Sequence, residues 1–451
     1  MSEPPSSDKL PVKTKLFYGV GDVGNALVNS AIQFFLMIFY TDAALLPAAV
    51  VGSALLFAKL WDAVNDPLFG WLSDRTTSRR FGKRRVFMIF GAVPLALSIM
   101  LLWFVPGGLS GISVFLWVLF TFVLFDTLWT MTTVPYYALT AELTDDYDER
   151  ASLTSYRMTL AVPAYLVGAA LTPALAGLFI TKHAGYGGIG IIYGVVAAAA
   201  LLISAAGLRE RKQMTEMRAT TPPLRTFLQT FRNRPFVQLL VAYLVLNGAF
   251  ALIKTLMVYF LIYQLNMEAE VSLVMGLMLI CVVLALFPWK LLAERWNKGP
   301  AYALGMAIGG LAVAATFLLP HQPTPWVYAI AAVAGIGFSA QWIFPWAMVP
   351  DVVDYDRLTT GEQRSGMYYG VWGLATKASE ALAIASTGWI LALFRYAPNV
   401  SQTDQTLLGI RLFFGPIPAV LIALCLPLLI WYPITRATHR ETRARLAGRE
   451  A

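Results

Sequence analysis

Two carboxylates stand one helical turn apart in a segment that is otherwise apolar enough to cross a bilayer. They are Asp62 and Asp66, within Trp61-Asp-Ala-Val-Asn-Asp-Pro67. Residues i and i+4 of a helix share a face, so both acids point the same way. Two ionised carboxylates at mid-bilayer are costly unless a cation lies between them. The spacing therefore predicts a site at which Asp62 and Asp66 bind a metal cation.

Two neighbours can add oxygen ligands to this site. Asn65 carries a side-chain carbonyl, and Pro67 has no N–H, so the backbone carbonyl of Ala63 loses its helical donor. Clusters of this kind suit hard cations such as sodium. A structural alternative stays open, in which one aspartate pairs with a basic side chain and the other caps a helix or faces a cavity.

Charged residues also fall within other apolar segments. Asp22 and Asp126 lie in the first and fourth of these, Arg157 begins the fifth, and Lys377 lies in the eleventh with Glu380 three residues on. Ionisable residues inside membrane segments often mark substrate or ion pathways. As structural alternatives, Arg157 can anchor a helix end to lipid headgroups and Lys377 can pair with Glu380.

Aromatic residues accompany these charges. Trp129, Tyr136, Tyr137 and Trp372 can stack on a sugar ring or shield an acyl chain. Aromatics in membrane segments are also common packing and interfacial residues. Both roles therefore remain open for each of the four.

Membrane-spanning helices must position these residues. The chain has 451 residues, of which 58% are hydrophobic and 13% charged, whereas soluble domains have about 25% charged residues. Apolar segments of roughly 20 residues, the length of a spanning helix, recur throughout. We count about twelve, near residues 17–41, 48–73, 86–105, 112–141, 157–180, 189–208, 236–264, 270–293, 300–319, 325–350, 367–394 and 409–435.

The basic residues indicate how the chain crosses the membrane. Lys and Arg gather in alternate connections and at both ends of the chain, whereas the connections at 105–111 and 319–325 carry none. Basic loops stay in the cytoplasm. We therefore expect a multi-pass protein of the bacterial cytoplasmic (inner) membrane with both termini cytoplasmic. The net charge of +8 is then a topology signal, and no nucleic-acid partner is expected.

The longest polar connection divides the apolar segments six and six. An acidic stretch follows the fourth segment, at 145–150, and another follows the tenth, at 351–357, so the two halves look related. Two related halves describe the major facilitator architecture. We expect an N-terminal tail at 1–16, a six-helix bundle at 17–208, a central loop at 209–235, a second six-helix bundle at 236–435 and a C-terminal tail at 436–451.

Gly70-Trp-Leu-Ser-Asp-Arg75, followed by Phe81-Gly-Lys-Arg-Arg85, resembles the cytoplasmic signature of major facilitators. That signature serves as a conformational latch between helices. The resemblance and the acidic stretches of both halves give these latch candidates: Gly70, Asp74, Arg75, Arg84, Arg150, Asp351 and Asp354.

The sequence gives little support for an enzyme. Cys281 and Cys425 lie in apolar segments, and His183, His321 and His439 are far apart in sequence. We found no nucleophile motif or phosphate-binding glycine loop in a connection. We expect a transporter with no cofactor, apart from a coupling ion that is Na⁺ or H⁺.

Several of these motifs together resemble the glycoside–pentoside–hexuronide:cation symporters, a major facilitator family that includes melibiose permease. The resemblance rests on Trp61-Asp-Ala-Val-Asn-Asp-Pro67, Val134-Pro-Tyr136, Tyr156-Arg157 and Pro350-Asp-Val-Val-Asp-Tyr355 with Lys377 downstream. It implies that Asp62 and Asp66 bind the cation with help from Thr130. Arg157 and Lys377 match the basic residues of helices five and eleven in that family.

Two departures leave the substrate open. The sugar-binding aspartates of melibiose permease align with Ala26 and Thr133, although Asp22 and Asp126 can replace them. The wider family includes sodium-dependent lysophosphatidylcholine symporters, and Tyr156-Arg-Met-Thr159 is one of several short stretches that look like theirs.

We therefore expect a twelve-helix, cation-coupled symporter that imports a sugar or glycoside by alternating access, with a lysophospholipid as the alternative substrate. Its partners would be this small-molecule or lipid substrate and membrane lipids, and we expect a monomer. The candidate substrate-binding residues are Asp22, Asn25, Asp126, Trp129, Thr133, Tyr137, Arg157, Trp372 and Lys377.

Overall fold

The computed structural model describes residues 9–76, 78, 80–144, 146–210, 229–361 and 364–450. Some sequence predictions fall outside these ranges. They concern residues 1–8 of the N-terminal tail, Arg79, Asp145, Ala451 and positions 211–228 of the expected central loop. The chain divides into two compact units, Met1–Met217 and Arg218–Ala451, and each is described by itself.

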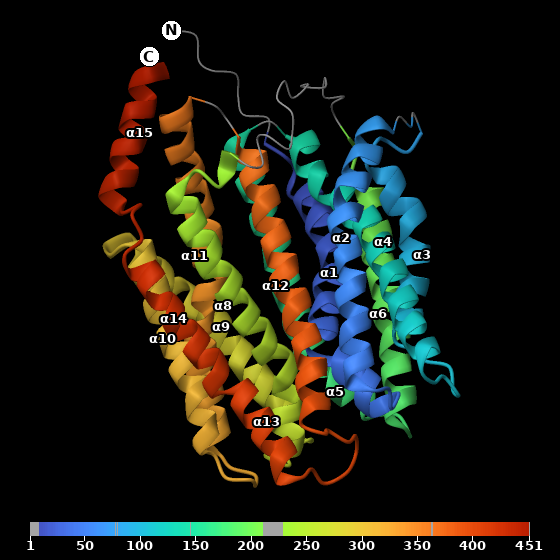
Figure 1. Cartoon of the computed structure of the whole chain (residues 1–451). Helices are drawn as coiled ribbons and strands as arrows, with labels where there is room; N and C mark the ends of the chain where they lie inside the picture. The colour runs from blue at the N-terminus through green and yellow to red at the C-terminus, as the bar shows by residue number, and fades with distance from the viewer. Residues whose placement is uncertain are drawn as a thin grey trace. The chain divides into compact units, whose positions relative to one another are not determined.

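Long helices make up the described part of the first unit (Figure 1). Helix α1 packs against α5 and α6, α2 packs against α4, and α3 packs against α4 and α6. The helices are α1 (Val12–Ile38), α2 (Ala48–Arg75), α3 (Arg85–Leu102), α4 (Ile112–Leu143), α5 (Tyr147–Ala176) and α6 (Lys182–Gly207).

The second unit has the same plan over its described residues. Helix α8 packs against α12 and α14, α9 packs against α11, and α10 packs against α11 and α14. The helices are α8 (Arg234–Tyr259), α9 (Val271–Arg295), α10 (Lys298–Ala315), α11 (Trp326–Thr360), α12 (Ser365–Leu393), α13 (Asp404–Phe414), α14 (Pro416–Ile430) and α15 (Arg436–Glu450).

The two units therefore repeat one pattern of helix pairing. The first helix of each contacts the fifth, and the third contacts the fourth; both the first and the third also contact the final spanning helix, α6 in the first unit and α14 in the second. A short π-helix also extends the first helix of each unit, at Phe39–Ala43 after α1 and at Phe260–Gln264 after α8. This matching arrangement supports the expectation of two related halves.

Local sequence explains where several helices begin. The Asp146 side chain accepts a hydrogen bond from the Glu149 N–H at the start of α5, and Thr181 and Asn233 cap α6 and α8 in the same way. Such caps satisfy N–H groups that have no partner within the helix. Glu210 does the same for α3, because its carboxylate accepts from the backbone N–H groups of residues 83, 84 and 85 at 2.6, 2.8 and 2.9 Å.

The predicted all-helical, membrane-spanning fold is confirmed, with two adjustments. Eleven helical stretches in the described part are long and apolar enough to cross a bilayer. Helix α12 has 29 residues, but it is not among these eleven. The last predicted span, 409–435, begins earlier, at Asp404, and is broken at Gly415, since Pro416 starts a new helix without an N–H to donate.

Candidate functional site

The predicted cation-site residues meet where α2 packs against α4. Thr130 of α4 donates a hydrogen bond to Asp66 Oδ1 at 3.2 Å. Asn65 Nδ2 donates to the backbone carbonyl of Asp126 at 3.1 Å and contacts its carboxylate at 3.5 Å. Asp62 is 3% exposed and Asn65 is fully buried. The packing of two helices therefore brings Asp62, Asn65, Asp66 and Thr130 together, and it adds Asp126.

The donor set of this cluster consists of oxygen atoms. Asn65 Oδ1 is buried and has no hydrogen-bond partner in the described part of the chain. Carboxylate, amide and hydroxyl oxygens suit a hard cation such as sodium. No group of three or more His, Cys, Asp or Glu among the described residues could hold a metal ion. The oxygen atoms of this cluster suit a hard cation better than a soft transition metal.

Sequence reasoning missed a lysine at this cluster. Lys59 Nζ lies 3.6 Å from Asp62 Oδ2 and 3.8 Å from Asp126 Oδ1. The i, i+3 spacing of Lys59 and Asp62 was the available signal. This contact is the pairing with a basic side chain that the structural alternative foresaw for one aspartate. The cation site at Asp62 and Asp66 remains a prediction.

A second charged cluster forms where α1, α4 and α5 meet. Asp22 Oδ1 accepts hydrogen bonds from the Tyr137 hydroxyl at 3.0 Å and from Asn25 Nδ2 at 3.3 Å. Arg157 Nε lies 3.6 Å from Asp22 Oδ2, and the guanidinium carbon lies 4.9 Å from the centre of the Tyr137 ring. Four of the predicted substrate residues are therefore in contact with one another.

Two features of this second cluster bear on ligand binding. Tyr137 is 42% exposed, whereas Asp22 is buried at 7%, so the cluster lies beneath an accessible tyrosine. Arg157 Nε is buried and has no hydrogen-bond partner in the part of the chain that the structure describes. This Nε is also the atom nearest Asp22, so the contact with Asp22 is an ion pair without a hydrogen bond.

The remaining predicted substrate residues of the first unit lie elsewhere. Asp126 belongs to the cluster of Asn65 and Lys59, as described above. The Thr133 hydroxyl donates to the carbonyl of Trp129 in its own helix at 2.8 Å, and the Trp129 ring packs 5.4 Å from that of Phe125.

In the second unit, Trp372 is fully buried and stacks on Tyr243, with ring centres 4.0 Å apart. Lys377 is half-buried one turn further along α12. A buried lysine of α8, Lys254, interacts electrostatically with Glu380. Sequence reasoning named only Lys377 as a partner for Glu380 and missed Lys254, because nothing in the order of residues shows that α8 faces α12.

The latch candidates of the first unit form an ion-pair network. Arg84 Nη2 lies 2.5 Å from Asp74 Oδ1, and Arg84 Nε lies 2.8 Å from Glu142 Oε1. Burial raises the pKa of the Glu142 carboxyl above its ordinary value, and its hydrogen bond with Arg84 opposes this shift. Arg75 instead stacks on Trp71, with its guanidinium carbon 4.3 Å from the ring centre.

Two further latch candidates of the first unit, Arg150 and Gly70, are found in other surroundings. Arg150 Nε donates to the backbone carbonyl of Thr144 at 2.9 Å. A Cβ added at Gly70 would meet no atom within 4 Å among the described residues, so packing there does not require glycine.

The latch candidates of the second unit contact the C-terminal helix. Lys298 Nζ lies 2.6 Å from Asp351 Oδ2. On α15, His439 Nε2 lies 3.4 Å from Asp351 and 3.5 Å from Asp354, and Arg443 Nε lies 3.3 Å from Asp354. The segment predicted as a C-terminal tail is therefore a helix held by ionisable side chains.

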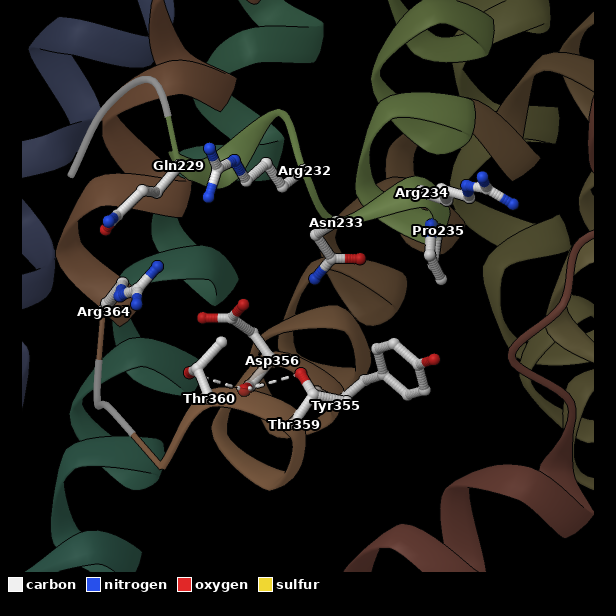
Figure 2. Close-up of a pocket in the computed structure, with 10 residues that line it drawn as sticks. All are labelled: Gln229, Arg232, Asn233, Arg234, Pro235, Tyr355, Asp356, Thr359, Thr360 and Arg364. Atoms are coloured by element: carbon white, nitrogen blue, oxygen red, sulfur yellow. Dashed lines mark hydrogen bonds between the residues drawn. The ribbon is translucent and has the colours of Figure 1, made fainter. Parts of the chain in front are cut away.

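Cavities of the second unit lie apart from the predicted site residues. One cavity has a volume of about 380 Å³, and polar side chains such as Arg232, Asn233, Asp356 and Arg364 contribute to its lining (Figure 2). An apolar cavity of about 410 Å³ includes Cys281 and Trp289. None of the predicted cation or substrate residues lines either cavity.

Two bundles of spanning helices with buried charges define a membrane transporter of the major facilitator class. The comparisons identify the family: residues 17–436 match the model described as MFS/sugar transport protein, and the chain belongs to that family. It is a multi-pass membrane transporter and not an enzyme.

Relatives match this chain along nearly its whole length. An uncharacterised symporter of Synechocystis is 29% identical, with 100% of this chain and 99% of the relative covered. The sodium-dependent lysophosphatidylcholine symporter 1 of Gallus gallus is 26% identical, with 98% of this chain and 90% of the relative covered. A sphingosine-1-phosphate transporter of Xenopus tropicalis is 28% identical, with 97% of this chain and 91% of the relative covered.

Solved structures share the fold. The nucleoside transporter NupG aligns with a TM-score of 0.67 over 92% of this chain and 99% of its own, at 14% identity. A peptide transporter of the POT type aligns with a TM-score of 0.63 over 93% of this chain and 94% of its own, also at 14% identity. At these identities the likeness concerns the fold alone.

Proposed function

We propose that this transporter is a sodium-coupled symporter that imports a lysophospholipid or a similar phosphate-bearing amphiphile. The two charged clusters of the first unit have separate roles in this proposal. Asp62, Asn65, Asp66 and Thr130 bind the coupling cation, and Arg157 with Tyr137, Asn25 and Asp22 binds the polar headgroup.

The oxygen cluster between α2 and α4 supports cation coupling. Asp62 and Asn65 are buried in a spanning segment, and Asp66 accepts a hydrogen bond from Thr130. Carboxylates are retained inside a membrane only where a cation or another partner offsets the desolvation. Relatives named as sodium-dependent symporters make sodium the first choice over protons.

The hydrogen bonds of Asp22 argue against a sugar as the group that binds at this cluster. A sugar site needs carboxylate oxygens that can accept hydrogen bonds from hydroxyl groups. Asp22 already accepts from Tyr137 and Asn25 and faces Arg157, while Asp126 faces Lys59 and Asn65. Both carboxylates on which the sugar interpretation relies are therefore engaged.

Arg157 instead offers what a phosphate requires. A guanidinium presents five N–H donors in a planar fork that matches phosphate oxygens. Arg157 Nε faces Asp22 at 3.6 Å without a hydrogen bond, and the neighbouring Tyr137 is exposed. Relatives named for lysophosphatidylcholine and sphingosine-1-phosphate agree with this choice.

A glycoside is the second candidate substrate. The matching family is described as MFS/sugar transport protein, which favours it. In that case Asp22 would have to exchange its hydrogen bonds with Tyr137 and Asn25 for bonds to sugar hydroxyls. Trp372 and Lys377, which lie in the second unit, are further candidate contacts for either substrate.

We also propose the membrane arrangement that the basic residues suggest. Both termini lie in the cytoplasm, residues 17–208 and 236–435 form the two bundles, and residues 209–235 connect them. The network of Arg84 with Asp74 and the network of Asp351 and Asp354 with α15 act as conformational latches on the cytoplasmic side.

A binding panel tests the substrate class. The purified protein would be heated in the presence of lysophosphatidylcholines of increasing acyl length and of a set of glycosides. We expect stabilisation by lysolipids that grows with chain length, at about 0.8 kcal/mol for each buried methylene. Arg157→Gln should abolish it, whereas Arg295→Gln, at an exposed arginine at the end of α9, should not.

Stabilisation by a glycoside alone would reject the lipid proposal. Stabilisation by lysolipids that is unchanged in Arg157→Gln would reject the role of Arg157. Detergent without added lysolipid is the reference, since lysolipids are themselves surfactants.

A further inference from the structure

A single ammonium group faces two carboxylates of the proposed cation site. Lys59 Nζ lies 3.6 Å from Asp62 Oδ2 and 3.8 Å from Asp126 Oδ1. The two distances are similar, so neither aspartate holds the lysine to the exclusion of the other. The side chains of Asp62 and Asp126 are only 4% and 5% exposed, so the interaction takes place away from bulk water.

The surroundings of Lys59 keep the ammonium at this position. Its Nζ lies 5.5 Å from the centre of the Phe122 ring, which is buried at 2% exposure. An aromatic face within about 6 Å attracts a cation. Lys59, Asp62 and Asp66 also share one face of α2, since they are three and seven residues apart. The lysine is therefore part of the same charged stripe as the proposed sodium ligands.

The charges of the cluster limit how strongly a sodium ion can bind. Three aspartates, Asp62, Asp66 and Asp126, contribute three negative charges, and Lys59 contributes one positive charge. A sodium ion that approaches Asp62 is attracted by the carboxylates and repelled by the ammonium. At separations of several ångströms in a protein interior, such repulsion is large compared with thermal energy.

We propose that Lys59 is a tethered cation that competes with sodium for Asp62 and thereby sets the sodium affinity of the transporter. This inference rests on the sodium coupling proposed above. When sodium is bound, the ammonium shifts toward Asp126; when sodium leaves, it returns to Asp62. A lysine suits this exchange because its charge is compact and its four-carbon stem is flexible.

The test uses thermal unfolding of the full chain in detergent at increasing NaCl, with choline chloride keeping the ionic strength constant. A ligand that binds only the folded state stabilises it according to its concentration and dissociation constant. Lys59→Met should bind sodium more tightly than the wild type, on the order of tenfold or more. Lys59→Arg keeps the charge and should stay close to the wild type.

Two further variants separate competition from a general effect of mutation. Lys59→Met combined with Asp126→Asn restores the net charge of the cluster, so its sodium affinity should fall back toward that of the wild type. Lys290→Met removes an exposed lysine of α9 and should leave sodium affinity unchanged. If Lys59→Met does not fold, Phe122→Leu retains the charge, loosens the ammonium and should raise sodium affinity a few-fold.

The outcomes distinguish this inference from the proposed function. Equal or weaker sodium binding by Lys59→Met overturns the inference while leaving sodium coupling intact. Sodium binding by Lys59→Met but not by the wild type supports the inference and rejects sodium as the natural coupling ion. Sodium binding by neither protein rejects both.

Discussion

Asp22 balances the charge of Arg157 in the interior of the first unit, and Asp22→Asn should therefore destabilise the protein. The substitution leaves the guanidinium, whose side chain is 18% exposed, without its counter-charge. Breaking a largely buried pair in this way costs about 3 to 5 kcal/mol. The hydrogen bond from Tyr137 to Asp22 also loses its charge, and such bonds contribute about 1.5 to 3 kcal/mol.

A melting experiment measures this cost. For a unit of 217 residues, each kcal/mol corresponds to a shift of about 2 to 4 °C, so Asp22→Asn should lower the melting temperature by about 6 °C or more. The double variant Asp22→Asn with Arg157→Gln removes both charges and should recover most of the loss, because replacing a whole buried pair is often nearly neutral.

Asp404→Asn, at an exposed aspartate in the first turn of α13, is the matched control and should shift the melting temperature little. A melting temperature for Asp22→Asn within about 1 °C of the wild type would refute the reasoning. So would a double variant that is no more stable than the single one, since the loss would then not come from an unpaired charge.

Three other predictions follow from the first unit. Thr130→Val removes the hydroxyl that donates to Asp66 and should weaken sodium stabilisation several-fold, measured by NaCl-dependent melting; unchanged sodium dependence would exclude the hydroxyl from the site. Gly24→Val should destabilise the fold by about 3 kcal/mol, because an added Cβ would come within 2.4 Å of a backbone carbon of α6. The control is Gly366→Val, where an added Cβ would meet no atom of the described residues within 4 Å; equal melting temperatures for the two variants would contradict this packing. Burial raises the pKa of Glu142, so its contribution to stability is largest below the ordinary carboxyl pKa of 4.5 and is lost as the pH rises through the folded-state pKa. The melting temperature of Glu142→Gln, measured between about pH 4 and 7, should lack this pH dependence. Parallel melting curves for the variant and the wild type would show that Glu142 does not titrate in this range.

The fold could be predicted from the sequence because hydrophobic length and charge placement are local properties of the chain. Segments of lipid-compatible length predict α2 and α4 within a few residues. The break between α13 and α14 depends on Gly415 and Pro416, and a hydropathy pattern alone does not reveal it. Lys377 and Glu380 lie within α12 without preventing its helix.

The site was harder to predict, because it depends on which helices pack together. Asp62 and Asp66 stand out on one helix, and their spacing alone shows that they share a face. The position of Asp126 depends on the packing of α4 against α2, so the sequence assigned it to the substrate and the structure places it beside Asn65. Lys254 could be related to Glu380 only after α8 was known to contact α12.

Lys59 illustrates a different limit of predicting the site from the sequence. It stands three residues before Asp62, near the middle of the predicted span at 48–73, so the sequence contains part of the signal, but its second partner, Asp126, lies on a different predicted span. The structure instead places its ammonium between two buried carboxylates. Charge pairs that combine a local contact with one from a neighbouring helix are recognised only when both helices are in place.

Sodium-driven uptake is the most direct test of the central claim. The protein would be reconstituted into liposomes, and accumulation of a labelled lysophosphatidylcholine would be measured with an inward sodium gradient and with sodium replaced by choline. We predict accumulation by the wild type only with the gradient, and none by Asp62→Asn or Asp66→Asn, although both variants fold. Full sodium-driven accumulation by both variants, or wild-type uptake that is the same with and without the gradient, would contradict the assignment of Asp62 and Asp66 as the coupling site.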